Sequence, residues 1–317
     1  MINADKQNQW EKDINKSVKN YDNWYEQYSV QAAKRVKNDS KKIVDLFLQK
    51  TDSITKFNSD IIKNNPELLT VARMMCSPIL AVDRLAGLSK VPNNKIRDLE
   101  KNKFPKNKNT FIKDDVPKII DVIKKLVDRE YFSSILSGKR PLSQEINIAK
   151  AILVDRISGS KANTLIRNEQ EKRQFQVIET YLKNKGYSNY RGDADSFNMP
   201  HGTYAFHKKV ELFRNSRDNS DGTVMTPMDI VIKRKDNYYR NPIWIECKSA
   251  GDFANVNKRR KEEGEKANQL KGTYGSQNKL YLFLGGYFNK SYLKYEAANN
   301  MDWVWEHRVK DLDGLKI

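Results

Sequence analysis

Cysteine, histidine and long apolar runs are scarce in this sequence. Its 317 residues include 2 cysteines and 3 histidines, and Cys76 and Cys247 stand far apart without a C-x-x-C partner. This usage excludes a disulfide framework and the common zinc motifs, and it is typical of a reducing compartment. No apolar run approaches the roughly 18 residues that a membrane-spanning helix needs. The polar stretch Met1 to Trp10 lacks a signal-peptide core, so we expect a cytoplasmic protein with no membrane partner.

Two widespread catalytic signatures are missing as well. The sequence has no glycine-rich loop of the kind that cradles phosphates, and no serine stands in a G-x-S-x-G elbow. These absences argue against a nucleotide cofactor and against serine-hydrolase chemistry. His201 and His207 have a spacing that does not suit one helix face and lack cysteine partners, so we interpret them as surface or loop residues rather than zinc ligands.

Positive charge, in contrast, is abundant. The chain has 58 lysines and arginines against 40 acids, a formal net charge of +18 and a pI near 9.6. Such a balance favours a polyanionic partner, of which nucleic acid is the commonest. The many Lys and Asn residues also fit an AT-rich coding sequence, so composition alone favours nucleic acid only modestly. With 38% hydrophobic residues, the chain can build the core of one large or two ordinary domains.

The sequence changes character near residue 160. Residues 1–160 read as helical, with helices expected around 115–137 and 143–158, and we predict that they form a helical DNA-binding or dimerisation domain. Residues 161–317 alternate between helices and strands. The expected elements there are a helix over Thr164–Lys185, strands around 203–213, 228–232 and 242–247, a charged helix over 254–271, and strands over Tyr281–Phe288 and Trp303–Trp305. This order predicts an α/β (α+β) domain with a mixed sheet flanked by helices.

The most informative segment reads as a β-hairpin. Met228–Ile232 and Pro242–Cys247 are apolar and rich in β-branched residues, and the polar stretch between them contains Asp236 and Asn237. A turn centred between Asn237 and Tyr238 sets Asp229 opposite Glu246. Directly opposed residues bring their Cβ atoms to roughly 4.5–5.5 Å, a distance at which one divalent ion can bridge two carboxylates.

The residue types at this hairpin suit phosphodiester hydrolysis. Asp229 and Glu246 are candidate ligands of Mg²⁺, which prefers oxygen donors, and a backbone carbonyl near Cys247 is a candidate third. Because side chains alternate along a strand, Lys248 points the same way as Glu246. Lys248 would position or deprotonate a water, or stabilise the transition state. The alternative is a surface hairpin with solvated charges, but charges within apolar strands are costly unless something compensates them.

These residues resemble a known group of enzymes. Pro227-Met228-Asp229 followed by Ile245-Glu246-Cys247-Lys248, between two helices, resembles the PD-(D/E)xK nuclease superfamily. The run from Ile245 to Glu263 is similar to type II restriction endonucleases of the XamI kind, as are Asp302–Arg308 and the helix around 168–186. The resemblance covers mainly residues 160–317.

The resemblance implies a Mg²⁺-dependent endonuclease core that acts as a homodimer on duplex DNA. It would cut at a short palindrome, such as the six-base GTCGAC, and leave 5′-phosphate and 3′-hydroxyl ends. Asp229, Glu246 and Lys248 match the catalytic triad, with Asp229 and Glu246 as the metal ligands. Glu171 is the best match for an additional glutamate on the first core helix, although it could instead form an i, i+4 ion pair with Arg167.

Cations after the second strand are candidate DNA contacts. The predicted set is Asn255, Asn257, Lys258, Arg259, Arg260 and Lys261. Phosphate contacts of this kind give affinity without sequence information. The alternative is a solvated helix balanced by nearby glutamates. Arg214, Arg217 and Asn219 are possible base readers, or part of a loop.

Two other functions fit part of the sequence. One is a repair or junction nuclease with the same core, which would cut by DNA structure rather than by sequence. The other is a regulator without catalysis, in which Ser77–Gly87 belongs to a helix-turn-helix. The regulator hypothesis leaves two acids within apolar strands unexplained.

Overall fold

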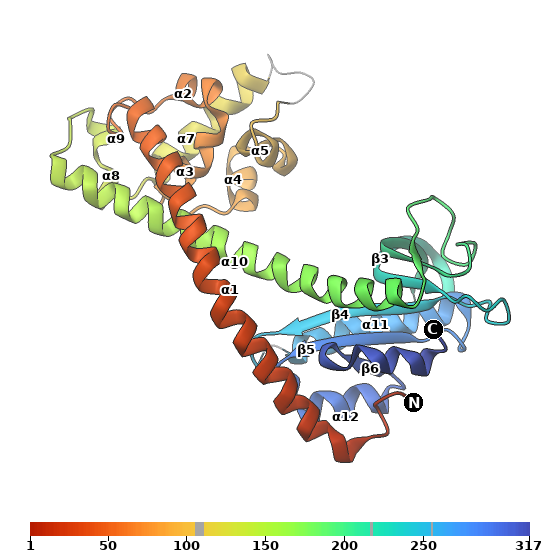
Figure 1. Cartoon of the computed structure of the whole chain (residues 1–317). Helices are drawn as coiled ribbons and strands as arrows, with labels where there is room; N and C mark the ends of the chain where they lie inside the picture. The colour runs from red at the N-terminus through yellow and green to blue at the C-terminus, as the bar shows by residue number, and fades with distance from the viewer. Residues whose placement is uncertain (105–110, 216–217, 255) are drawn as a thin grey trace. The chain divides into compact units, whose positions relative to one another are not determined.

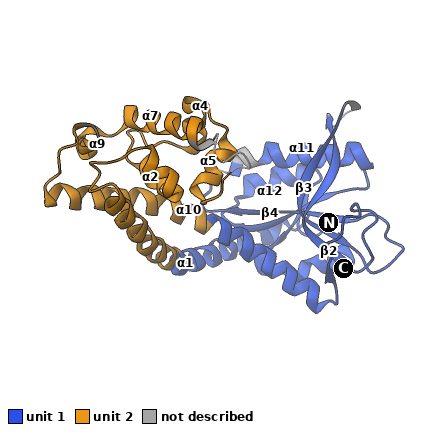
Figure 2. Ribbon diagram, turned by 90° about the horizontal axis from the view of Figure 1, so that it is seen from above, with its two compact units in different colours: residues 1–28, 167–317 blue, residues 29–166 orange. Residues whose placement is uncertain are grey.

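The computed structural model describes most of the chain, in two compact units. The described residues are 1–104, 111–215, 218–254 and 256–317; of these, the side chains at 111–112, 135–136, 215, 218–221 and 257–259 are left out of the description. Residues 29–166 form one unit, here called the helical unit, and residues 1–28 with 167–317 form the other, here called the sheet unit (Figure 2). Asn255, a predicted DNA contact, and Arg217, considered as a possible base reader or part of a loop, lie outside the described residues.

The helical unit is built from short helices around one apolar core. Its elements are α2 (Ser59–Asn64), a 3₁₀ turn (Pro66–Leu68), α3 (Leu69–Met74), α4 (Val82–Ser89), α5 (Asn93–Glu100), a π-helical segment (Phe111–Asp115), α7 (Val116–Leu126), α8 (Arg129–Phe132) and α9 (Ser134–Ser137), together with parts of α1 and α10. Helix α7 shows how the core forms: Val116, Ile119, Ile120 and Ile123 recur at helical spacing and are buried. Apolar spacing of this kind predicts helices without reference to their partners.

Two long helices belong to both units. Helix α1 (Gln7–Lys50) passes from the sheet unit into the helical unit, and α10 (Ser143–Asn184) returns. The helices expected over 143–158 and 164–185 are therefore one helix. It continues through Gly159, where an added Cβ would meet no atom within 4 Å, and the Ser158 hydroxyl donates to the Val154 carbonyl. Among the described residues, no helix has an apolar stretch long enough to cross a bilayer.

One six-stranded mixed sheet forms the centre of the sheet unit. The strands, in spatial as well as chain order, are β1 (Ser188–Asn189), β2 (Thr203–Asn215), β3 (Asp218–Lys233), β4 (Ile243–Ala250), β5 (Leu280–Gly286) and β6 (Asp302–Trp305). Strand β3 pairs antiparallel with β2 and with β4, whereas β5 pairs parallel with β4 and β6. This arrangement confirms the expected α/β class with a mixed sheet.

Helices cover both faces of this sheet (Figure 1). Residues of α10, including Ile178 and Leu182, pack on the face that carries Ile243 and Ile245. Helices α11 (Val256–Tyr274) and α12 (Lys290–Ala298) supply residues to the core on the other face, which includes Trp244. The 3₁₀ segment Glu306–Leu315 contributes to the α10 side.

The first residues of the chain are fixed to the sheet unit. The backbone N–H groups of Asn3 and Ala4 donate to Asp302 Oδ1 at 2.9 and 3.0 Å, and the Trp10 indole donates to the Asn3 carbonyl at 2.9 Å. Trp10 is buried and its ring lies 5.5 Å from that of Trp303. Residues 1–28 therefore pack with the β-sheet, and the boundary expected near residue 160 falls inside α10.

Candidate active site

The two predicted acids lie opposite each other at the end of the β3–β4 ladder. Ile232 pairs with Ile243, Val231 with Trp244, and Ile230 with Ile245. One further step in this register sets Asp229 opposite Glu246, which confirms the turn centre predicted from the sequence. Backbone pairing of the two strands stops at Ile230 and Ile245, so the acids stand where the strands separate.

Beyond this point, backbone N–H groups of the two strands donate to carboxylate oxygens instead of to backbone carbonyls. The Cys247 N–H donates to Asp229 Oδ2 at 2.8 Å, and the Asp229 N–H donates to Glu246 Oε1 at 3.3 Å. The Glu246 side chain is only 4% exposed. Burial, and then the negative charge of Glu246, raise the pKa of Asp229, while the Cys247 N–H opposes the rise. Two close carboxylates with little access to water form a site that requires cations.

An irregularity in the neighbouring strand accompanies this change. The β2–β3 pairs include Phe206 with Ile230 and Lys208 with Met228 but skip His207 and Asp229. His207 has a φ of 48°, which is uncommon for a residue with a side chain. Irregularities of this kind re-aim side chains and are frequent beside active sites.

Lys248 lies on the same side of β4 as Glu246, as the strand alternation predicted. Its Nζ is 3.2 Å from Glu246 Oε2. Burial disfavours the charged ammonium, but the carboxylates of Glu246, Glu263 and Asp229 outweigh it and raise the pKa of Lys248 above the usual lysine value. These carboxylates therefore favour the protonated, cationic form of Lys248.

A buried glutamine from α10 fixes the strand that carries Lys248. Gln174 Nε2 donates to the Lys248 carbonyl and to the Phe283 carbonyl, both at 3.2 Å, and so joins β4 to β5. Gln170, one helical turn earlier, donates to Ser249 Oγ at 3.2 Å. The helix was predicted from its periodicity, but the sequence contained no signal that its polar residues would support the end of β4.

Glu171 lies on α10, the helix that covers the sheet face opposite to α11. Its side chain is half-exposed, and its carboxylate is 3.8 Å from His207 Nε2. This ion-pair partner differs from Arg167, the alternative partner considered from the sequence. The structure brings Asp229, Glu246 and Lys248 together, whereas the catalytic role of Glu171 stays a prediction.

Lys266 is a member of the site that the sequence did not reveal. It belongs to α11, and its Nζ donates to Glu246 Oε1 at 2.6 Å and to the Pro227 carbonyl at 2.7 Å. Its side chain is 18% exposed. In the sequence, Lys266 is one of several lysines in a charged helix, and only its position beside the buried Ala267 distinguishes it. The nearby Gln269 instead donates to the Arg214 carbonyl.

The predicted phosphate contacts lie at the beginning of α11. Asn257, Lys258 and Arg259 are helical, but their side chains are outside the described part of the structure. The guanidinium of Arg260 lies over the rings of Tyr292 and Tyr295, at 5.7 and 5.2 Å from their centroids. Lys261 is exposed. Arg260 is thus held against α12, while Lys261 presents its charge to solvent.

The donor set fits a hard divalent ion held partly by water. Among the described residues, no group of three or more His, Cys, Asp or Glu side chains could hold a metal. Asp229 and Glu246 offer two carboxylates, and the backbone carbonyl of Pro227 lies beside Glu246, since Lys266 bridges them. Mg²⁺ commonly binds through one or two carboxylates and keeps several waters, so these residues fit it.

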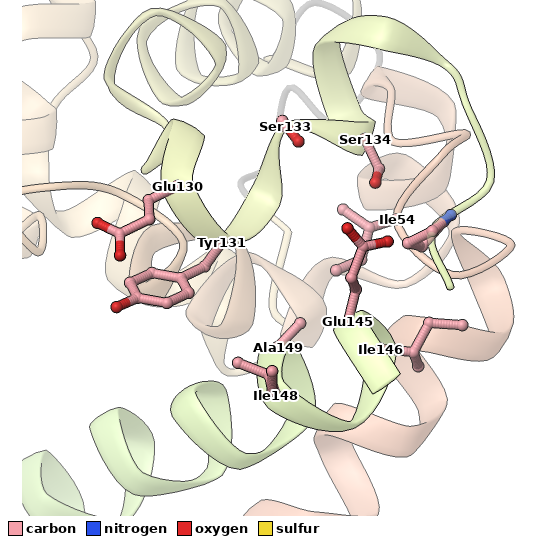
Figure 3. A pocket seen from close by; sticks show the side chains of 10 residues that line it. Ile54, Glu130, Tyr131, Ser133, Ser134, Glu145, Ile146, Ile148 and Ala149 are labelled. Carbon is pink, nitrogen blue, oxygen red and sulfur yellow. The ribbon is translucent and has the colours of Figure 1, made fainter. Parts of the chain in front are cut away.

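A pocket in the helical unit has a different character (Figure 3). Its volume is about 270 Å³, and Figure 3 shows Glu130, Tyr131, Glu145, Ile146 and Ile148 around it. No lysine or arginine is among the residues that line it, and two glutamates would repel phosphate. The lining of this pocket therefore suits a phosphate less well than the sheet unit's cluster around Glu246, where Lys248 and Lys266 lie.

Two acids and a lysine thus meet where strands β3 and β4 of the mixed sheet separate. In a comparison with known proteins, residues 52–305 match the family described as XamI restriction endonuclease. The chain belongs to this family of restriction endonucleases, which confirms the resemblance seen in the sequence.

The similarity to one type II restriction enzyme extends over nearly the whole chain. The type II restriction enzyme SalI of Streptomyces albus G is 36% identical over 321 residues, with 99% of each chain covered. Among solved structures, protein VC1899 from Vibrio cholerae aligns with 82% of this chain and 56% of its own, at 10% identity and a TM-score of 0.26. That structural likeness is too low to carry an argument.

Proposed function

We propose that this chain is a type II restriction endonuclease that hydrolyses phosphodiester bonds of duplex DNA at a short palindromic site, with Mg²⁺ as cofactor. The observation that carries the proposal is the meeting of Asp229, Glu246 and Lys248 where β3 and β4 separate. The similarity to a type II restriction enzyme along nearly the entire chain supports it. Such an enzyme would act in the cytoplasm, where it meets incoming DNA.

In this proposal Asp229 and Glu246 hold the ion. Bound Mg²⁺ would neutralise charge on the phosphate, orient it and lower the pKa of a water. The Cys247 N–H orients the Asp229 carboxylate through its 2.8 Å hydrogen bond. Because Gln174 ties the Lys248 carbonyl to β5, the end of β4 is held in place, which keeps the acids preorganised.

Of the roles considered from the sequence, we propose that Lys248 stabilises the transition state as a cation, and the carboxylates that raise its pKa support this role. A lysine that remains protonated cannot accept a proton from water. Its ammonium can instead stabilise the negative charge that grows on the phosphate oxygens in the transition state. Glu171 is proposed as an additional acid, and replacing it by Gln while measuring cleavage tests that role.

DNA contacts and symmetry complete the proposal. The segment 255–261 comes shortly after β4 in the chain, and we propose that its Asn, Lys and Arg residues meet phosphates beside the scissile bond. For Arg260 this would require its guanidinium to leave the rings of Tyr292 and Tyr295. Two copies of the chain related by a two-fold axis would match a palindrome and cut both strands. The proposed partners are therefore duplex DNA and a second copy of this chain.

Digestion of a mapped plasmid that contains GTCGAC tests this function. Discrete fragments that require Mg²⁺, lost in Glu246→Gln and kept in Glu265→Gln, are expected. Glu265 is an exposed acid on α11 and serves as the matched control. Sequencing of the fragment ends identifies the site and stagger. A smear independent of sequence would indicate a structure-specific nuclease, and binding without cleavage would indicate a regulator.

A further inference from the structure

Lys266 holds the Glu246 oxygen that faces Asp229. Its Nζ donates to Glu246 Oε1 at 2.6 Å, and that same oxygen accepts the Asp229 N–H at 3.3 Å. The second bond of Lys266 goes to the Pro227 carbonyl at 2.7 Å. The other oxygen of Glu246 is 3.2 Å from Lys248. Both oxygens of this buried acid thus already have an ammonium partner.

The arrangement brings opposite charges together within a small volume. Lys248 and Lys266 both contact Glu246, and Asp229 lies beside that acid. Charge-assisted hydrogen bonds of this kind are the strong ones, and breaking a buried pair leaves a carboxylate uncompensated. Lys266, together with Lys248, therefore stabilises the acids when no metal ion is bound.

The oxygens bound by Lys266 are also those that suit a metal. A carboxylate and a backbone carbonyl are hard oxygen donors of the kind that Mg²⁺ prefers. A divalent ion that takes Glu246 Oε1 as a ligand must displace the ammonium, because two cations repel each other strongly at such separations.

We propose that Lys266 is an internal counter-ion that competes with the divalent metal for Glu246 and so weakens metal binding in the absence of DNA. This inference rests on the proposed metal site of Asp229 and Glu246. It assigns to Lys266 a positioning role that is distinct from the role of Lys248. The physical basis is exchange: each metal ion that binds must first free a carboxylate oxygen from a hydrogen bond to an ammonium.

The test measures Mn²⁺ binding to the full-length protein without DNA, at fixed pH and low salt, from the paramagnetic resonance signal of free Mn²⁺. Lys266→Met removes the charge and keeps an apolar stem of similar length. We expect it to bind Mn²⁺ about tenfold more tightly than wild type, which equals about 1.4 kcal/mol. Lys266→Arg keeps a cation and should bind Mn²⁺ close to the wild-type level. Lys271→Met, on the same helix, is the control.

Thermal unfolding gives a second readout. Lys266→Met should have a lower Tm than wild type without metal, and Mn²⁺ should raise its Tm by more than it raises that of wild type. If Lys266→Met does not fold, Lys266→Gln keeps a donor for the Pro227 carbonyl and is expected to show the same tighter binding.

The outcomes separate this inference from the proposed function. Unchanged or weaker Mn²⁺ binding by folded Lys266→Met or Lys266→Gln overturns the counter-ion role, and a loss of cleavage without tighter binding would identify Lys266 as a second catalytic cation instead. If the single substitution Glu246→Gln binds Mn²⁺ as tightly as the wild-type protein does, the metal site itself is misassigned and both proposals fail.

Discussion

The helical unit, residues 29–166, has 27 lysines and arginines against 15 acids, whereas the sheet unit has 31 against 25. The smaller unit thus carries +12 of the chain's net charge of +18, and the larger unit carries +6. Among the described residues, buried charged side chains are distributed the other way, with most of them in the sheet unit.

Among the described residues, the helical unit buries one charged side chain, Arg73, which pairs with Glu100 at 2.5 Å. The sheet unit buries six. They are Asp13, Lys233, Glu246, Glu263, Glu296 and Asp302. Buried charge is costly unless it is paired or used, so its concentration in the sheet unit points to the place where the chemistry occurs.

The two units therefore differ in where their charge lies: the helical unit has the larger net positive charge, and the sheet unit has most of the buried charged side chains among the described residues. Surface cations attract a polyanion over a distance set by salt, without reading its sequence. Buried carboxylates and ammonium groups act at one position and depend on accurate geometry. We therefore expect substitutions in the two units to fail in different assays.

The largest effect is expected for Glu246→Gln. Loss of one charged oxygen donor should lower the cleavage rate roughly a thousandfold, about 4 kcal/mol of barrier. Binding of the same duplex, measured by gel shift, should survive. If Glu246→Gln cleaves DNA almost as fast as wild type, as the control Glu265→Gln is expected to, Glu246 does not take part in the chemistry. Its burial in the sheet unit would then no longer mark the place of cleavage.

Lys248→Met should follow, with a loss of roughly a hundredfold in kcat, the scale of one electrostatic interaction with a transition state. If Lys248 acts as a cation in the transition state, the wild-type rate should show no rise with pH that tracks deprotonation of a lysine. A pH–rate profile tests this, and Lys279→Met, at an exposed position, is the control. A rate that climbs with loss of the lysine proton would favour the base role.

Glu296 should make stability depend on pH. Burial, and then the charge of Glu263, raise the pKa of Glu296 to about 8, and neither carboxylate oxygen has a hydrogen-bond partner among the described residues. Because the folded pKa exceeds the unfolded one, the folded state binds more protons between these values, and stability is lost as pH rises toward 8.

Replacing Glu296 by Gln should abolish this dependence. Wild type is expected to lose on the order of 2 kcal/mol between pH 6 and pH 8, as measured by urea unfolding, and Glu296→Gln should change much less. An equal decrease in both proteins would show that Glu296 is ionised throughout this range.

The smallest effect concerns surface charge, and two matched sets of lysines on α1 measure it. Lys34, Lys37 and Lys41 are exposed in the helical unit, and Lys12, Lys16 and Lys19 are exposed in the sheet unit. If the helical unit binds DNA, replacing the first set by Gln should reduce the slope of log affinity against log salt by about 1 for each phosphate that the protein no longer neutralises. The second set should change the slope less. A larger change from the second set would assign DNA attraction to the sheet unit.

Much of the hairpin could be predicted from the sequence. The apolar strands on either side of Asn237 and Tyr238 are symmetric about the turn, and register follows from that symmetry. Asp229 and Glu246 were therefore expected to stand opposite each other on local grounds. Strand alternation placed Lys248 with Glu246 for the same local reason.

Other features depend on partners distant in the chain. Lys266 reaches Glu246 across 20 residues, from a helix whose charged composition favours no particular lysine. The packing of residues 1–28 on the sheet depends on Asp302, which is 298 residues from Ala4 in the chain. The continuous α10 shows that weak helix formers such as Ser158 and Gly159 do not end a helix whose remaining residues favour it.

Local sequence was enough to determine the class of fold, the register of the β3–β4 hairpin and the side of β4 on which Glu246 and Lys248 lie. These features follow from periodicity and turn position. Which cations face those acids was settled only in the folded molecule, because helix α11 must dock on the sheet before Lys266 can meet Glu246. The same holds for the packing of the first residues against the sheet, because hydrogen bonds between distant segments have no periodic signature.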